Sequence, residues 1–296
     1  MRYYNIANIK IMFDGIDAED FEESFCSKLI EYETGRFDIA DMNVKFTTDY
    51  RVDIPQGKEV ACFNWRHWVK TDTGYFIYDT APDTGETVLY IKADETWSNI
   101  TIAFDYIERF AGAKNDLRLF NIMIEVLKQG ILWHNGIIVH SSSIKYTDND
   151  GNDYGLIFSA KSGTGKSTHT QLWQTLYGDR VKIINDDTPI LKFESDGVML
   201  CGMPWSGSTG INSNCITPLK AIVFIQRGTQ NSIRPLTATE ALPRLLSETA
   251  KSVFVQNLNR TLEAADKLIK NVDIYLLTCN ISTDAVKTVQ QELGIK

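Results

Sequence analysis

The sequence has 296 residues, which suffices for one large or two modest domains and excludes a small scaffold held by disulfides. Hydrophobic residues make up 43% and charged residues 23%. These fractions are typical of folded globular proteins and exclude intrinsic disorder and fibrous repeats. The 30 basic and 38 acidic residues leave a net charge of −8. The sequence has no Lys/Arg-rich run that would gather positive charge locally. We therefore expect no binding to nucleic acid or to anionic membranes.

Targeting and redox signals are also missing from the sequence. No apolar stretch reaches the eighteen or so residues that a membrane span needs, and residues 1–10 do not resemble a signal peptide. The five cysteines are odd in number, widely spaced and never in a CxxC pair. We predict a cytoplasmic protein with neither a disulfide framework nor a zinc site.

Residues 1–114 are predicted to form a smaller, β-rich N-terminal domain. A strand is expected at 3–13, a helix at 21–32, and several strands with turns at 73–74 and 84–85 between residues 62 and 106. The many aromatic residues here fit cross-strand pairs in a sheet or, alternatively, an aromatic ligand groove. We assign no chemistry to this region.

Residues 115–296 are predicted to form a second domain that mixes helices and strands. A helix from 115 places one apolar face inward, at Leu119, Ile122, Met123, Val126 and Leu127. Further elements are expected as strands at 137–140, 154–158, 181–184, 190–193, 198–201, 219–225 and 272–278, and helices ending near Gly178, within 238–269 and at 283–293. The long polar stretch at 202–218 is typical of a functional loop.

Residues 160–167, AKSGTGKS, fit the phosphate-binding pattern [AG]xxxxGK[ST] between a predicted strand and a predicted helix. In that context the backbone N–H groups and the positive helix end converge on phosphate oxygens. Lys166 would reach the β- and γ-phosphates of a nucleotide, and Ser167 would ligate Mg²⁺. The predicted nucleotide-binding residues are Ser162, Gly163, Thr164, Gly165, Lys166, Ser167 and Thr168. The alternative is a structural glycine-rich turn.

Two carboxylates, Asp186 and Asp187, follow the predicted strand at 181–184. One carboxylate can hold Mg²⁺ while the other accepts the proton of an attacking hydroxyl. A solvated turn before Pro189 is the structural alternative. His140 ends a strand one hairpin before the glycine-rich loop, so it becomes a candidate for the same site, although a lone strand-end histidine is often structural.

The remaining histidines and two arginines are further candidates for the same site. His67 and His134 are predicted to be structural, and His169, in the first turns of the loop's helix, is expected to be exposed. Arg227 and Arg234 flank the end of the strand at 219–225. They would stabilise phosphate charge or serve only solubility.

Four segments together resemble the HPr serine kinase/phosphorylase superfamily, which shares a phosphate-loop core with ATP-dependent phosphoenolpyruvate carboxykinase. They are VHSSS at 139–143, SAKSGTGKST at 159–168, INDDTPIL at 184–191 and CGMPWSG at 201–207. The resemblance covers roughly residues 130–295. It implies an α/β (α+β) fold in which a carboxykinase-like mixed sheet wraps the loop.

The resemblance also implies roles for individual residues. Lys166 and the loop amides would hold the phosphates, Ser167 and Asp186 would organise Mg²⁺, Asp187 would be the base and His140 would face the transferred group. Which of Asp186 and Asp187 is the base stays open. The HPr enzymes' Glu-x-Arg-Gly-Met signature lacks its Glu and Arg at residues 199–203 here. HPr itself is therefore not the expected acceptor.

The predicted function is Mg²⁺-dependent transfer of the ATP γ-phosphoryl group to a hydroxyl, on a Ser/Thr of a peptide or protein or on a small molecule. The main alternative is a non-catalytic nucleotide-binding module. A carboxykinase-type enzyme ranks below both, because the chain is short and the arginine and metal-binding motifs of those enzymes are not found. Related enzymes assemble into oligomers, so a homo-oligomer is one expected state, although nothing in the sequence marks an interface.

Overall fold

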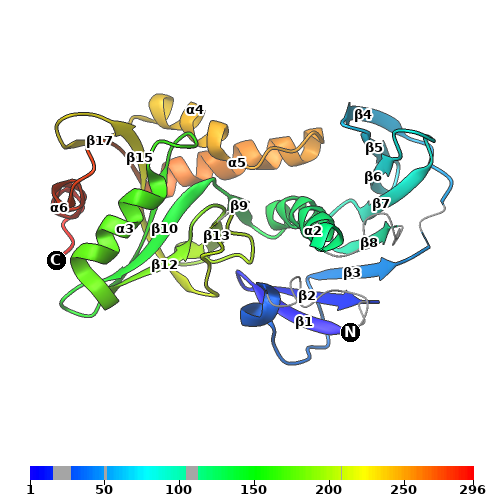
Figure 1. Ribbon diagram of the computed structural model, residues 1–296, viewed down its shortest axis with the longest axis horizontal. Helices are drawn as coiled ribbons and strands as arrows, with labels where there is room; N and C mark the ends of the chain where they lie inside the picture. Colours follow the sequence, from blue (N-terminus) through cyan, green and yellow to red (C-terminus); the bar gives the residue numbers. More distant parts are fainter. Residues whose placement is uncertain (16–27, 50–51, 105–112, 208) are drawn as a thin grey trace. The chain divides into compact units, whose positions relative to one another are not determined.

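The computed structural model describes residues 1–15, 28–49, 52–104, 113–207 and 209–296, with only the backbone of 113–120. The chain forms a mixed α/β structure with two sheets (Figure 1). Two compact units share it: residues 1–134 with 252–258, and residues 135–251 with 259–296. The predicted boundary at 114/115 lies within helix α2 (Ala113–Trp133), which clusters with the first unit.

The first unit is built on an eight-stranded sheet, in the order β1-β2-β3-β8-β7-β6-β5-β4. Its strands are β1 (Arg2–Ile6), β2 (Ile9–Asp14), β3 (Met42–Thr47), β4 (Lys58–Phe63), β5 (Arg66–Thr71), β6 (Gly74–Thr80), β7 (Thr87–Asp94) and β8 (Asn99–Phe104). The pairs β2–β3 and β3–β8 are parallel and the other neighbours antiparallel. The predicted β-rich character of this region and its turns at 73–74 and 84–85 are confirmed.

The predicted single strand at 3–13 is wrong, because a tight turn divides it into the hairpin β1–β2. Ala7 and Asn8 have φ values of 54° and 58°, as in the type I′ turns that match the twist of paired strands. Asn tolerates this conformation but Ala seldom adopts it, so the sequence gives little warning. Of the helix predicted at 21–32, residues 21–27 lie outside the described residues; residues 30–32 form the 3₁₀ turn η1 (Ile30–Tyr32).

Aromatic side chains fill much of the first unit's core. Tyr75 stacks on Trp97 with ring centroids 5.4 Å apart, and Phe254 lies 4.5 Å from the Tyr75 ring. Phe254 precedes helix α5 (Val255–Asn271), so a late segment of the chain completes this core. Tyr75, Trp97 and Phe254 therefore serve packing, although Trp97 in the β7–β8 turn and Phe254 in a late segment do not form the cross-strand pairs that the sequence interpretation predicts.

The second unit is built on a nine-stranded sheet whose main path is β12-β10-β11-β15-β14-β13-β9, with β17 beside β15 and β16 beside β17. Its strands are β9 (Gly136–Ile138), β10 (Ser141–Thr147), β11 (Asp153–Ser159), β12 (Val181–Asn185), β13 (Ile190–Glu194), β14 (Gly197–Cys201), β15 (Ile216–Arg227), β16 (Ser232–Pro235) and β17 (Asp273–Cys279). Its helices are α3 (Lys166–Tyr177), α4 (Ala238–Glu248), α6 (Thr283–Glu292) and most of α5. The predicted mixed sheet is confirmed.

The directions in which the strands pair bring the ends of several strands to one edge of this sheet. Strands β11, β15 and β17 are parallel, so their carboxyl ends share that edge. Strand β10 runs antiparallel to both β11 and β12, which places its start and the end of β12 at the same edge. The glycine-rich loop, the Asp186–Asp187 pair and His140 all follow or precede these strand ends.

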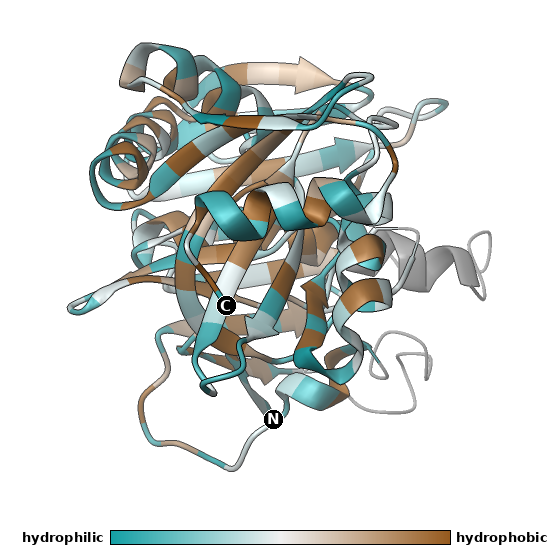
Figure 2. Cartoon of the chain, turned by 90° about the vertical axis from the view of Figure 1, so that its left-hand side faces the viewer, coloured by the Kyte–Doolittle hydropathy of each residue, from teal (hydrophilic) through white to brown (hydrophobic). Residues whose placement is uncertain are grey.

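Helices α3 and α6 cover a hydrophobic cluster on the sheet. Trp173 of α3 and Val286 and Val289 of α6 are buried in this cluster together with Phe158 of β11. In Figure 2 the strands carry long hydrophobic stretches, whereas the helices alternate hydrophilic and hydrophobic residues, as amphipathic helices on a sheet do. No helix among the described residues combines the length and apolar character needed to cross a bilayer.

Two details of the second unit differ from the sequence predictions. The strand expected at 137–140 ends at Ile138, and His140 instead precedes β10, because Val139 leaves the sheet to bond Pro189 and to bridge Thr249. Strand β16, four residues long, was not predicted. The other predicted strands and helices of this region are present within a few residues of their expected bounds.

Candidate active site

The glycine-rich loop joins β11 to α3 and is shaped by two glycines. Gly163 and Gly165 have φ values of 75° and 121°, which side-chain-bearing residues rarely adopt, and a Cβ at either would meet nothing within 4 Å. These glycines are needed for backbone conformation and leave the surface above them open. Gly165 is also the N-cap of α3 and offers no side chain to bond its first N–H groups. The helix therefore begins with unsatisfied donors, which favour an anion.

Lys166 is largely buried and folds back across the loop. Its Nζ donates to the Ala160 carbonyl at 3.1 Å and lies 3.2 Å from His140 Nε2. Burial lowers the pKa of the Lys166 ammonium, and the carboxylates of Glu248, Asp187 and Asp186 oppose that shift. The lysine is thus held beside the acidic pair by both packing and charge.

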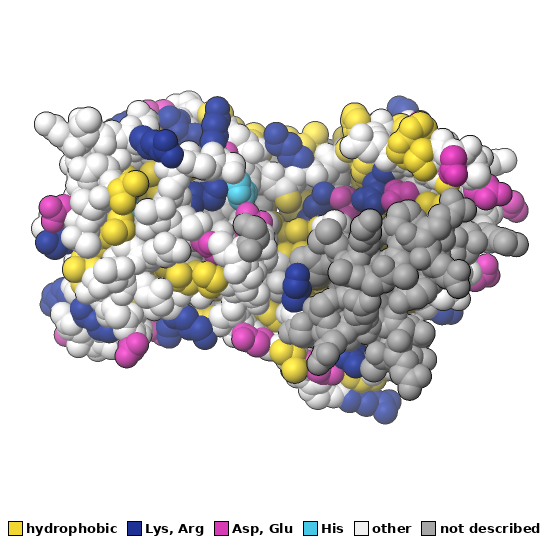
Figure 3. All heavy atoms as spheres, in the orientation of Figure 1, with side chains coloured by type: hydrophobic (Ala, Val, Ile, Leu, Met, Phe, Trp, Pro, Cys, Tyr) yellow, Lys and Arg dark blue, Asp and Glu magenta, His cyan; other side chains and the backbone are white. Residues whose placement is uncertain are grey.

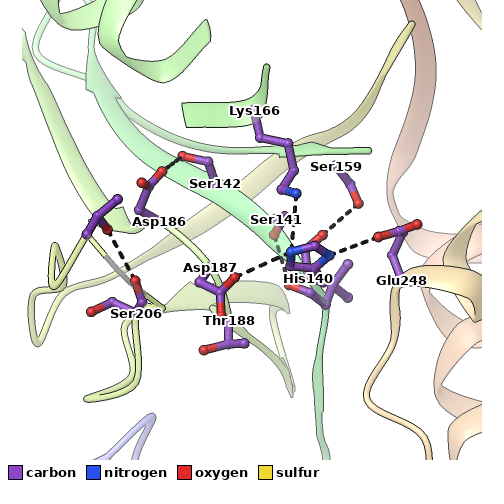
Figure 4. Close-up of polar contacts among 12 residues, drawn as sticks. His140, Ser141, Ser142, Ser159, Lys166, Asp186, Asp187, Thr188, Ser206 and Glu248 are labelled. Carbon is purple, nitrogen blue, oxygen red and sulfur yellow. Dashed lines mark hydrogen bonds and ion pairs between the residues drawn. The ribbon is translucent and has the colours of Figure 1, made fainter. Parts of the chain in front are cut away.

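His140 is fixed between two carboxylates (Figure 4). Its Nδ1 lies 3.0 Å from Glu248 Oε2 and its Nε2 lies 3.4 Å from Asp187 Oδ1. The backbone N–H of His140 also donates to the Glu248 carbonyl at 2.7 Å. The hydrogen bond with Asp187, and then that with Glu248, raises the pKa of the imidazole against the effect of burial. Glu248 fixes the ring so that Nε2 faces Asp187 and Lys166.

Asp186 differs from its neighbour in burial and in hydrogen bonding. Its side chain is 6% exposed, and Oδ1 accepts a 2.5 Å bond from the Ser142 hydroxyl. Its Oδ2 is buried without a hydrogen-bond partner, which is costly for a carboxylate unless a ligand satisfies it. Asp187, by contrast, is one-third exposed. The two carboxylates therefore lie in different surroundings.

A buried asparagine shapes the turn that presents both aspartates. Asn185 Oδ1 accepts the backbone N–H groups of Asp187 and Thr188 at 2.9 and 2.7 Å. Its Nδ2 donates to the carbonyls of Met203 and Trp205, both at 2.8 Å. The acidic turn and the 202–215 loop are consequently held together by one amide.

The 202–215 loop also closes against the acidic pair. The Ile211 carbonyl accepts the Asp186 N–H at 3.2 Å, and Ser213 N–H donates to the Ile184 carbonyl at 2.9 Å. At Gly207, where φ is 62°, a Cβ would come within 3.0 Å of the Asp187 side chain. The long loop that the sequence marks as functional thus lines the candidate site.

These elements enclose a cleft of about 320 Å³. It brings together nearly all the predicted site residues: His140, Ser162, Gly163, Gly165, Lys166, Ser167, Thr168, Asp186 and Asp187. Thr164 is the exception, because it lines the two neighbouring clefts. On the face drawn in Figure 3, a histidine side chain lies between basic and acidic side chains. Among the residues that line the cleft, Lys166, Asp186 and Asp187 supply charge of both signs.

The two candidate arginines have different hydrogen-bond partners in the structure. Arg227 Nε donates to the Thr164 carbonyl at 3.2 Å and its Nη2 donates to the Gly163 carbonyl, so the guanidinium braces the glycine-rich loop. Arg234 instead pairs with Glu240 at 2.7 Å, beside the start of α4.

The prediction that His169 is exposed is wrong. Its side chain is 3% exposed, lies against Phe158 and accepts a 3.3 Å bond from the Trp173 indole. The face of α3 that carries His169 packs on the sheet, and the sequence pattern alone did not identify that face. His67 stacks on Tyr78 in the first unit's sheet, in keeping with a structural role.

A magnesium ion fits the oxygen donors of this cleft. The partnerless Oδ2 of Asp186, the Asp187 carboxylate and the Ser167 hydroxyl are the hard oxygen ligands that Mg²⁺ prefers. Within the described part of the chain, no three His, Cys, Asp or Glu side chains form a metal-binding group. Any Mg²⁺ here would take its remaining ligands from water and phosphate, as is usual for this ion.

Sequence reasoning missed Glu248, Asn185 and Ser142 as contributors to the site. Glu248 lies 108 positions from His140, and nothing local in its helix distinguishes it from a surface glutamate. Asn185 offers a weak signal, because Asn before two backbone donors favours an Asx turn. Ser142 offers none, since the sequence does not specify which of three consecutive serines faces Asp186.

Comparison with known proteins adds little to this geometry. No family model matches the sequence, and no curated protein matches it. Among solved structures, the Hpr(Ser) kinase/phosphatase from Coxiella burnetii aligns with 53% of this chain and 92% of its own, at 10% identity and a TM-score of 0.31. A likeness this distant assigns neither family nor function to the chain.

Proposed function

We propose that the chain is a Mg²⁺-dependent phosphotransferase that moves the γ-phosphoryl group of ATP to a hydroxyl of a peptide, protein or small molecule. The observation that carries the proposal is the convergence of Lys166, Asp186, Asp187 and His140 at the start of α3, within one cleft. Phosphoryl transfer requires mainly positioning and charge neutralisation, and this arrangement supplies both.

The glycine-rich loop is the proposed phosphate cradle. The uncapped N–H groups at the start of α3 and the Lys166 ammonium offer donors and positive charge to phosphate oxygens. Arg227 donates to two loop carbonyls, which stabilises the conformation that these donors need. A cradle preorganised in this way loses little entropy when the nucleotide binds.

The differing surroundings of the two aspartates support different roles. Asp186, with its partnerless oxygen, is the proposed Mg²⁺ ligand together with Ser167. Bound Mg²⁺ would neutralise phosphate charge. Asp187, more exposed and beside His140, is the proposed base. It takes the proton of the acceptor hydroxyl as the acceptor oxygen bonds the γ-phosphorus, while the bond from that phosphorus to the ADP oxygen breaks.

The test is label transfer from γ-labelled ATP with Mg²⁺ to peptides encoded beside the gene and to a panel of small hydroxyl compounds. We expect Asp187→Asn to reduce transfer at least a hundredfold while ADP affinity stays within a few fold, because general-base catalysis contributes about 10²–10⁴. Lys166→Ala should weaken both phosphoryl transfer and ADP binding. Asp196→Asn, at the exposed β13–β14 turn, is the matched control and should retain wild-type transfer.

An Asp187→Asn variant as active as the wild type would remove the assignment of the base. Nucleotide binding without transfer to any acceptor would favour the non-catalytic nucleotide-binding module. Failure to bind ADP or pyrophosphate would exclude both functions.

A further inference from the structure

A second cleft of about 320 Å³ lies on another side of the glycine-rich loop, between α3 and the ends of β15 and β17. It meets the phosphate cleft at Gly165 and Thr168, which line both. A Cβ at Gly165 would meet nothing within 4 Å, so the surface at this junction is open. A ligand lying along the loop can therefore extend past Thr168 from one cleft into the other.

The walls of this second cleft are largely apolar, and Arg227 is the one Lys, Arg, Asp or Glu residue among those that line it. Leu172 of α3, Ile225 of β15 and Ile281, just after β17, all line it. Ile281 is 80% exposed, an unfavourable state for a large aliphatic side chain at the rim of a hollow. A flat apolar ligand in the cleft would remove part of this surface from water.

The third cleft around the loop has a different chemistry. It is larger, about 760 Å³, and includes Lys161, Arg244 and Glu248 among its lining residues. Charged walls favour an ionic ligand, whereas a neutral heterocycle gains more from aliphatic walls. Of the two clefts that flank the loop, the apolar one suits an uncharged aromatic ring.

We propose that the cleft between Leu172, Ile225 and Ile281 is the subsite for the base of the bound nucleotide. The inference rests on the proposed function, since it assumes that the loop holds the nucleotide's phosphates. The phosphates then lie over Gly165 and Lys166, and the base passes Thr168 to lie against the aliphatic walls. Ile281 forms the exposed lip that closes over the base.

The test compares the binding of ADP and of inorganic pyrophosphate, both with Mg²⁺, by calorimetry. ADP and pyrophosphate share two phosphates, so the ratio of their affinities isolates the nucleoside. We expect Ile281→Ser to weaken ADP about fivefold, from the apolar contact that is lost, and to leave pyrophosphate unchanged. Ile281→Leu should preserve the ratio. Ile39→Ser, at an equally exposed isoleucine of the first unit, is the matched control.

Each outcome addresses one of the two proposals. If neither ligand binds the wild type, the proposed function itself fails. If pyrophosphate binds and ADP binds no more tightly, or if Ile281→Ser leaves the ratio at the wild-type value, the base lies elsewhere and only this inference is overturned. A ratio changed by Arg244→Gln and not by Ile281→Ser would place the base in the larger charged cleft.

Discussion

At the scale of single residues, His169 shows how burial changes the chemistry of a side chain. The ring lies under α3 against Phe158 and accepts a hydrogen bond from Trp173, so the neutral form is the one that fits. Burial lowers the pKa of His169 to about 4. Protonation would place a charge in the core and break the bond from Trp173.

The stability of the protein should therefore depend on pH in part through the imidazole of His169. The imidazole of His169 binds its proton near pH 6.5 in the unfolded chain but only near pH 4 in the folded chain. Its contribution to the free energy of unfolding is therefore complete above pH 6.5. It is lost as the pH falls towards 4, by roughly 3 kcal/mol in the free energy of unfolding. Urea denaturation at several pH values should show this slope in the wild type and a smaller slope in His169→Gln, which keeps an acceptor but does not titrate. Equal slopes in the wild type and in His169→Gln would contradict the assignment of this pH dependence to His169.

At the scale of elements, α4 links a capping motif to the candidate active site. Thr237 and Glu240 form a capping box at its start, and Arg234 pairs with the same glutamate. The last residue of the helix is Glu248, which holds His140. Pro243 lies inside the helix and cannot donate a backbone hydrogen bond, so the cap carries more of the helix's stability.

Loss of this cap should lower the stability of the protein measurably. We expect Thr237→Ala to reduce the free energy of unfolding by about 1 kcal/mol, since the threonine side chain accepts the Glu240 N–H in the capping box. Chemical denaturation measures the change. Thr175→Ala, on an exposed face of α3, is the control and should change stability by less than about 0.5 kcal/mol. Similar losses in both variants would argue against the cap.

At the scale of the whole molecule, the two compact units are not contiguous in sequence. Residues 252–258 return to the first unit, where Phe254 packs on Tyr75, and Asn257 bonds Gln129 and Trp133. The first unit's core is therefore incomplete until most of the chain has been synthesised.

Removing the Phe254 ring should destabilise the first unit in particular. Phe254→Ala leaves a cavity beside Tyr75 and Trp97, a change that costs about 3–5 kcal/mol in well-packed cores. Hydrogen exchange measured by mass spectrometry should show faster exchange in β6 and β8, with β11 and β15 much less affected. Equal acceleration in both units would mean that they unfold together.

Much of the second unit's local structure could be predicted from the sequence. Most of the strands and the helix stop at Gly178 depend on signals within a few residues, and the structure has them. The hairpin turn at Ala7 and Asn8 could not be predicted, because Ala in a left-handed conformation carries no local signal. The buried face of α3 was misjudged because tertiary packing decides which side of a helix is covered.

The glycine-rich loop, its lysine and the acidic pair could be identified from the sequence by itself, because the proposed phosphate site requires these residue types at fixed local spacing. The tertiary structure alone decided that β10, β11 and β12 bring His140, the loop and Asp186–Asp187 to one sheet edge. It alone added Glu248 and the apolar cleft at Ile281. Such contacts join residues a hundred positions apart, and their register is set by strand pairing and core packing, which no short stretch of sequence encodes.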